Sequence, residues 1–256
     1  MKTSTNLEVL FTPAEFAALS RRDLSQTVCV VFDILRATST MMTALANGAR
    51  EIIPVGEIEE ALATRQSRPD VLLAGERNGL RIRAQQTGGP DFDLGNSPRE
   101  FTRETVDGRT IIMTTTNGTR ALRACAAAES VLIGSFLGMQ ALADRIAQAR
   151  PSCLVLVCSG TLEQAAYEDA LAAGSLCEAI WPIYSAGNLA DSAQIAAQIY
   201  RRSRNDLLAA VQSGRNARRL LANPELRDDV PACLAADTIS FLAELCKDGA
   251  VRAVAK

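Results

Sequence analysis

The residues with the clearest chemical capacity lie between Thr114 and Arg120, where threonines, an asparagine, a glycine and an arginine follow one another. A short apolar run precedes them and a helical pattern follows. Free N–H groups and the helix dipole favour an oxyanion at such a strand-to-helix junction. Thr119 alone could serve only as an N-cap, but the cluster exceeds that need. We predict a phosphate-binding site that includes Thr115, Thr116, Asn117, Gly118, Thr119 and Arg120.

Two acid–arginine pairs occupy similar positions, each directly after an apolar, strand-like run. Asp33 precedes Arg36 by three residues, and Glu76 is next to Arg77. Each pair could simply stabilise a turn as an ion pair. Adjacent carboxylates and guanidiniums also suit a metal ion that carries a phosphate. We predict catalytic roles for all four residues, with Asp33 and Glu76 as Mg²⁺ ligands.

Further polar groups follow the same pattern at other strand ends. Thr38 and Ser39 come after Arg36, and Ser159-Gly160 end another apolar run; we predict that all four contact an oxyanion. Glu168 and Asp169 begin the next helical segment, where acids are often present only for the helix dipole. Either could turn inward as a third carboxylate, and we predict Asp169 as a metal ligand.

Cys158 ends the apolar run before Ser159. Its usual role there is that of a small buried core residue, and a nucleophilic role ranks lower.

The composition excludes several classes of chemistry. The chain has no histidine, which excludes a His-based triad, a phosphohistidine and any His-ligated metal. Acid–base work then falls to carboxylates, metal-bound water, Lys, Tyr or Cys, and a metal would need oxygen or thiolate ligands. The net charge of −2 gives no sign of nucleic-acid or membrane-surface binding.

Cysteine usage and the N-terminus predict a cytoplasmic protein. None of the seven cysteines forms a C-x-x-C pair, and several lie in apolar runs, as expected for reduced, buried thiols. The first eight residues are polar and lack a signal-peptide core, and no apolar run approaches membrane-spanning length. The apolar character of the predicted helices favours association of two copies of the chain as a homodimer.

Strand-like and helix-like segments alternate along the first two thirds of the chain. The strand candidates are at residues 27–32, 51–55, 71–74, 110–113, 130–133 and 154–158. The helix candidates are at residues 38–47, 58–65, 97–103, 119–128, 139–149 and 163–179. This alternation predicts an α/β fold with three layers, α/β/α, around a largely parallel or mixed sheet.

The last third has a different, mostly helical pattern. Its candidates are at residues 190–202, 206–213, 215–221 and a segment from 228 that includes Cys233. We predict a single unit over residues 1–256, divisible near residue 185 into a strand–helix part and a helix-rich C-terminal part. Four polar clusters follow the carboxyl ends of strands, which is the ligand-binding edge of open α/β sheets.

Three other sequence motifs give weaker evidence of function than the strand-end clusters. Asp91-Phe92-Asp93 resembles a phosphatase Asp-x-Asp motif, but it lies in a long loop candidate, residues 81–96. Cys246 and Arg252 have thiol-phosphatase spacing, but a helix-like run precedes the cysteine where a strand is needed. Neither a P-loop nor a dinucleotide fingerprint is present.

The motifs together resemble the Mg²⁺-dependent 2-phosphosulfolactate phosphatases of coenzyme M and sulfolactate metabolism. The matching segments are residues 31–40, 73–79, 92–98 and 114–120, with a weaker match at Cys158-Ser159-Gly160 and Glu168-Asp169. In this chain Ser159 stands where the family has alanine, and residues 161–167 replace a glycine-rich stretch.

This resemblance implies a three-layer fold and Mg²⁺-dependent hydrolysis of 2-phospho-3-sulfolactate to 3-sulfolactate and phosphate. It adds Asn96 and Ser97 as substrate-contact candidates. The alternatives are a phosphatase for another small phosphoester, a non-catalytic binder of a small anion at the same edge, and a phosphotransferase.

Overall fold

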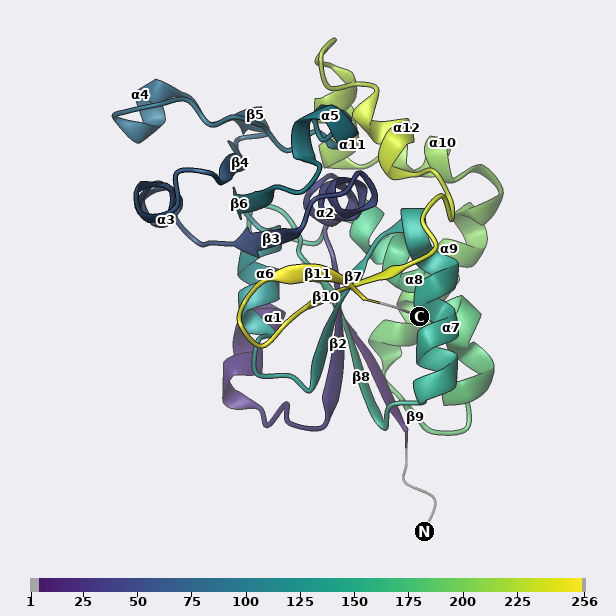
Figure 1. The fold of residues 1–256 in the computed structure, drawn as a ribbon. Helices are drawn as coiled ribbons and strands as arrows, with labels where there is room; N and C mark the ends of the chain where they lie inside the picture. The colour runs from purple at the N-terminus through teal and green to yellow at the C-terminus, as the bar shows by residue number, and fades with distance from the viewer. Residues whose placement is uncertain (1–4, 255–256) are drawn as a thin grey trace.

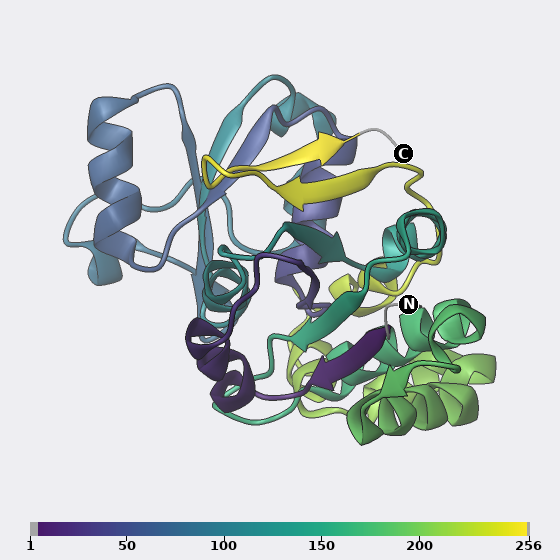
Figure 2. The same ribbon diagram turned by 90° about the horizontal axis from the view of Figure 1, so that it is seen from below.

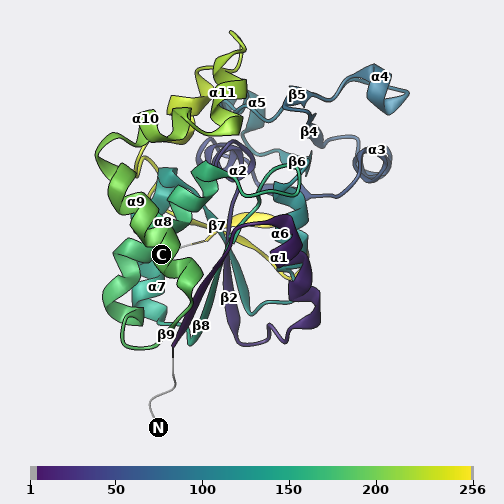
Figure 3. The same ribbon diagram turned by 180° about the vertical axis from the view of Figure 1, so that it is seen from behind.

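The computed structural model describes residues 5–254, so the first four residues of the polar N-terminal segment and the last two of the predicted unit lie outside it. Within this range, eleven strands form one mixed sheet with helices on both faces (Figure 1). Seen from behind, α1 and α6 again lie on one side of β2, and α7, α8 and α9 on the other (Figure 3). The predicted α/β fold with three layers is confirmed.

The strands are β1 Asn6–Leu10, β2 Thr27–Phe32, β3 Glu51–Pro54, β4 Leu72–Arg77, β5 Leu80–Arg81, β6 Thr110–Thr114, β7 Ser130–Gly134, β8 Cys153–Cys158, β9 Asn188–Leu189, β10 Leu242–Leu245 and β11 Val251–Val254. The helices are α1 Pro13–Ala17, α2 Ala37–Ala46, α3 Ile58–Ser67, α4 Ala84–Thr87, α5 Arg103–Val106, α6 Gly118–Ala124, α7 Met139–Ala149, α8 Tyr167–Tyr184, α9 Asp191–Ser203, α10 Leu207–Gln212, α11 Arg215–Leu221 and α12 Asp229–Cys233. Short 3₁₀ turns lie at Ala18–Arg21, Pro98–Glu100, Phe136–Gly138 and Arg204–Asp206.

All six predicted strands are present, but three predicted helices differ from the structure. The helix expected at 119–128 ends already at Ala124. The helix expected at 97–103 is a 3₁₀ turn followed by α5, because Phe101 leaves the helical region and buries its ring in the core. The helix expected at 163–179 begins only at Tyr167, after Leu162 and Glu163 adopt left-handed backbone conformations.

The mostly helical pattern of the last third was wrong for residues 242–254. Leu242–Leu245 and Val251–Val254 form an antiparallel hairpin, β10–β11, within the sheet. The sequence Leu-Ala-Glu-Leu consists of good helix formers, so its local preference is overridden by pairing with neighbouring strands. Cys246 therefore follows a strand and not a helix-like run. Since β11 follows it directly, Cys246 and Arg252 lie in a hairpin, without the helix that a thiol-phosphatase loop needs.

The strand order is β5-β4-β6-β3-β11-β10-β7-β2-β8-β1-β9, which contains two parallel groups. One group is β4, β6 and β3, and the other is β7, β2, β8, β1 and β9. The hairpin β10–β11 lies between them and pairs antiparallel with each group through a single residue pair. Three antiparallel steps separate β3 from β7, so the two groups run in opposite directions along the ladder.

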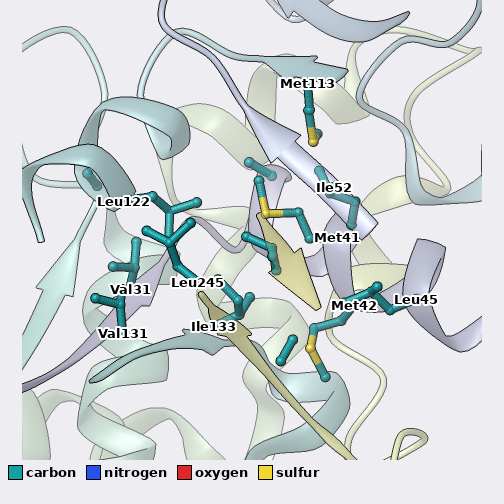
Figure 4. Close-up of a cluster of buried hydrophobic side chains, with 14 of the residues drawn as sticks. Val31, Met41, Met42, Leu45, Ile52, Met113, Leu122, Val131, Ile133 and Leu245 are labelled. Carbon is teal, nitrogen blue, oxygen red and sulfur yellow. The ribbon is translucent and has the colours of Figure 1, made fainter. Parts of the chain in front are cut away.

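Alternate side chains of each strand enter different halves of the core. In β2, Cys29 and Val31 pack with α2 and α6, whereas Val30 and Phe32 pack with α7 and α8. Figure 4 shows part of the first half, a cluster that contains Met41 and Met42 of α2, Val31 of β2 and Leu245 of the hairpin. This two-sided burial explains why the strands are nearly continuous apolar runs.

Seen from below, the hairpin crosses between the two strand groups, and α3 packs at the far side of the β3-β6-β4 group (Figure 2). Within the described residues, no helix combines the length and apolar character needed to cross a membrane.

Candidate active site

The four polar clusters predicted from the sequence converge on one pocket with a cavity volume of about 80 Å³. They reach it from both strand groups: two clusters follow β2 and β8, and two follow β4 and β6. The residues that line it are Asp33, Leu35, Arg36, Glu76, Asn78, Gly79, Asn96, Thr116, Asn117, Ser159, Gly160, Thr161, Leu162, Glu168, Asp169, Asn216, Arg219 and Leu220. The site is thus a junction of two opposed sets of strand ends, and not the single parallel edge that the sequence suggested.

Asp33 stands directly after β2 and is 9 % exposed. Its Oδ1 accepts a hydrogen bond from the Ala37 N–H at 3.0 Å, while the Asp33 N–H donates to the Thr38 hydroxyl. A Cβ at Gly118 would lie 2.7 Å from Asp33 Oδ2, so the absent side chain lets α6 approach the carboxylate. Burial raises the pKa of Asp33 to about 6, and the negative charge of Glu76 adds to the shift.

Glu76, near the end of β4, has both carboxylate oxygens occupied. Its Oε1 accepts hydrogen bonds from the N–H and the hydroxyl of Thr116, each at 2.8 Å. Its Oε2 accepts one from the Gly79 N–H at 2.6 Å. Glu76 therefore ties the loop after β6 to the turn after β4.

Arg36 is 3 % exposed and lines the pocket, but its guanidinium is already bonded. Nη1 donates to Asp229 Oδ2 at 2.6 Å, and Nη2 donates to the carbonyl of Gly79 at 2.7 Å. Asp229 is fully buried and also accepts a hydrogen bond from the Ser97 hydroxyl at 2.7 Å. Arg36, which was predicted to be catalytic, thus joins the β2 turn to α12 and to the β4 turn.

Asp169 connects the turns after β2 and β8. It accepts hydrogen bonds from the Ile34 N–H at 2.8 Å, the Ser159 hydroxyl at 3.1 Å and the Gly160 N–H at 3.2 Å. Burial raises its pKa well above the usual range, and the charges of Glu168 and Asp33 add to this.

Glu168 is buried beside Asp169, and burial likewise raises its pKa. One of its oxygens, Oε1, accepts a hydrogen bond from Asn216 at 2.5 Å. The other, Oε2, has no hydrogen-bond partner among the described residues, and the same is true of Asn96 Oδ1 in the same pocket.

The threonine cluster is divided between the pocket and its support. Thr116 and Asn117 line the pocket, and Gly118 lies against Asp33. Thr115 and Thr119 bond to each other: the Thr119 hydroxyl donates to the Thr115 carbonyl at 3.0 Å. These two threonines fix the turn into α6.

Several predicted site residues lie outside the pocket lining, and their substrate contacts stay predictions. Arg120 is exposed and pairs with Glu163 at 2.8 Å. Arg77 donates to the Glu76 carbonyl and to the Thr114 hydroxyl. The other residues outside the lining are Thr38, Ser39, Ser97, Thr115, Gly118 and Thr119. Cys158 is fully buried in the core, where burial raises its thiol pKa.

Three residues of the helical C-terminal segment were missed by sequence reasoning. Asn216 and Arg219 of α11 line the pocket, and Asp229 of α12 binds Arg36. No spacing rule could find them, because they lie beyond the strand–helix alternation and reach the site only through packing. Asp91 and Asp93, by contrast, lie outside the pocket: Asp91 accepts from the Ala84 N–H and Asp93 from the Leu73 N–H.

Among residues 5–254, no three or more His, Cys, Asp or Glu side chains are grouped as a preformed metal site. Mg²⁺ needs no such cage, since it commonly uses about one or two carboxylates together with waters and substrate phosphate. Asp33, Asn96 Oδ1 and Glu168 Oε2 offer hard oxygen donors in one pocket, which fits Mg²⁺ chemically.

The fold and the pocket define the class of protein: an α/β protein with an acidic, carboxylate-lined pocket at the carboxyl ends of its strands. Comparison with known proteins identifies the group within that class. The family model described as 2-phosphosulpholactate phosphatase matches residues 15–248.

Curated relatives agree with this match. A protein of Caldanaerobacter subterraneus subsp. tengcongensis, named probable 2-phosphosulfolactate phosphatase, is 39 % identical over 93 % of this chain and 95 % of its own length. Proteins of the same name from Symbiobacterium thermophilum and Clostridium novyi are 37 % and 35 % identical, covering 86 % and 84 % of this chain and 91 % and 87 % of their own. The chain belongs to the 2-phosphosulfolactate phosphatase family, which confirms the resemblance and the class of phosphoric monoester hydrolase.

Proposed function

We propose that this protein hydrolyses 2-phospho-3-sulfolactate to 3-sulfolactate and phosphate with Mg²⁺. The observation that carries the proposal is the pocket itself, where Asp33 faces the loop that holds Thr116, Asn117 and Gly118. Family membership and the name of the relatives support the substrate. We also propose a cytoplasmic role in sulfolactate or coenzyme M metabolism.

Mg²⁺ would be held by Asp33 and the two unpartnered oxygens, Asn96 Oδ1 and Glu168 Oε2. When bound, it supplies positive charge that polarises a phosphoryl oxygen. It also offsets the repulsion between the buried carboxylates, which share one pocket in the protein alone.

The side chains of this site then have separate tasks. Asn117 donates to a phosphoryl oxygen, and Glu76 accepts both donors of Thr116 and so holds the loop that carries Asn117 in place. Gly118, which has no side chain, lets the start of α6 lie against the Asp33 carboxylate. In the reaction the ester P–O bond breaks, the oxygen of water joins phosphorus, and a proton reaches the hydroxyl oxygen of sulfolactate.

The test is phosphate release from 2-phospho-3-sulfolactate, measured with Mg²⁺, with Mn²⁺ and with a chelator. We expect release that requires a divalent metal. Hydrolysis of other small phosphoesters but not of this one would remove the substrate and leave the class. Binding of the compound without hydrolysis of any phosphoester would favour the non-catalytic binder, and labelling of an acceptor other than water would favour a transferase.

A further inference from the structure

We propose that Arg219 of α11 binds the sulfonate of the substrate and is the residue that selects a sulfonated phosphoester. This inference rests on the proposed function and assigns a part of the site that the strand-end motifs do not supply. A sulfonate presents three acceptor oxygens, and the planar fork of a guanidinium can donate to two of them at once.

The first argument concerns the positively charged side chains that line the pocket. Two arginines, Arg36 and Arg219, line it. Arg36 is buried and its guanidinium is bound to Asp229 and to the Gly79 carbonyl. Arg36 and Arg99 form ion pairs with Asp228 or Asp229 of the C-terminal segment. Within residues 5–254, Arg219 takes part in none of these pairs. Arg219 is therefore the pocket cation whose donors are available to a ligand.

The second argument is the placement of the guanidinium. Arg219 Nη2 would lie 3.2 Å from a Cβ at Gly79, and Arg219 Cζ 3.5 Å from it, so the group lies over the turn after β4. Gly79 has a φ of 76°, and its N–H is bonded to Glu76. The Arg219 head group thus lies at the pocket wall next to Glu76.

The third argument is that α11 is fixed to the site and not merely near it. Asn216 donates to Glu168 Oε1 at 2.5 Å and to the Thr161 hydroxyl at 2.8 Å. Arg215 donates to the Thr161 carbonyl at 2.7 Å. These bonds hold the helix against the loop after β8, so Arg219, three residues after Asn216, is positioned by the same contacts.

The fourth argument is charge. Asp33, Glu76, Glu168 and Asp169 all line the pocket, and this acidic interior repels any anion that is not paired with a metal or a cation. A bound metal would pair with the phosphate. The substrate carries a phosphate, a carboxylate and a sulfonate; the sulfonate needs its own cation, and the exposed Arg219 at the rim provides it.

The test compares Arg219→Ala with Arg218→Ala, using 2-phospho-3-sulfolactate and 2-phospholactate, which differ only in the sulfonate. Arg218 is the matched control, because it is an exposed neighbour on α11 that donates to the Ser213 carbonyl and does not line the pocket. We expect Arg219→Ala to lower kcat/KM for the sulfonated substrate at least 10-fold, mainly through KM. For 2-phospholactate the change should stay below 3-fold, and Arg218→Ala should change neither.

Equal losses on both substrates, or no loss on either, would overturn the assignment while leaving the hydrolase itself intact. If the wild-type protein hydrolyses neither compound, the proposed function fails, and calorimetry with 3-sulfolactate and with lactate decides the assignment separately. Binding of sulfolactate that Arg219→Ala abolishes supports Arg219. Equal binding by both proteins, or binding by neither, overturns it.

Discussion

The turn after β2 and the turn after β4 carry the same sequence signature, an acid with an arginine close behind it, yet they have different structures. Asp33 has one oxygen directed at α6 and a raised pKa, whereas both oxygens of Glu76 are saturated by N–H and O–H donors. Neither arginine pairs with its neighbouring acid: Arg36 binds Asp229, and Arg77 binds backbone and hydroxyl oxygens. From this comparison we propose that the first turn supplies chemistry and the second supplies support.

The largest expected effect that tests the different roles of the two turns is on catalysis. Asp33→Asn should lower phosphate release about 10²–10⁴-fold, because a buried carboxylate at the reacting phosphate is lost. The amide oxygen can still accept from the Ala37 N–H, so the unfolding transition should be retained. Steady-state rates and thermal unfolding measure the two effects. Near-wild-type turnover would show that Asp33 is not part of the chemistry.

Replacing Arg36 should cost much more stability than replacing Arg77. Arg36→Met leaves the fully buried Asp229 without its cation and should cost about 3–5 kcal/mol in the free energy of unfolding. Arg77→Met, the matched change in the other turn, removes hydrogen bonds from a half-buried side chain and should cost about 1 kcal/mol. Denaturant unfolding of both variants checks this, and equal losses would contradict the difference.

A pH titration of the metal-free protein should show the contribution of the buried Asp33 carboxyl to stability. The pKa of Asp33 is raised by burial to about 6, so the folded state binds this proton more tightly than the unfolded state. Stability is therefore favoured at low pH and should fall, by about 3 kcal/mol from this group, as pH rises from about 4 to beyond 6. Asp33→Asn should flatten this part of the profile, and Mg²⁺ should restore stability at pH 8. If Asp33→Asn leaves the pH profile of stability unchanged, Asp33 is not the cause of this pH dependence.

The smallest effect should come from Glu76→Gln. The amide keeps one acceptor oxygen but presents N–H donors to a group that already donates, either Thr116 or Gly79. We expect a loss of about 1–3 kcal/mol in stability and a smaller rate effect than for Asp33→Asn. Parallel assays of both variants test this. A loss of turnover equal to that of Asp33→Asn, in a fully stable protein, would place Glu76 in the chemistry as well.

Sequence patterns predicted the parts of this protein in which local and global preferences agree. The run that became β2 is apolar on both faces, as expected of a strand that is covered on both sides, and the polar residues after it therefore lie at its end. The pattern failed at Leu242–Leu245, where helix-forming residues pair as a strand. It also could not show Asn216 and Arg219 in the pocket, since that contact depends on the packing of α11, which begins 175 positions after the first motif ends at residue 40.

The order in which the chain is synthesised gives the hairpin β10–β11 a further consequence. These strands join the two opposed strand groups, yet residues 242–254 leave the ribosome after every other strand of the sheet. Each group can pair within itself while translation proceeds, but the bridge between them can only be completed at the end. Since the pocket is made from the ends of both groups, its two walls should come into register in the final step of folding, with the long-range pairing that slows such steps.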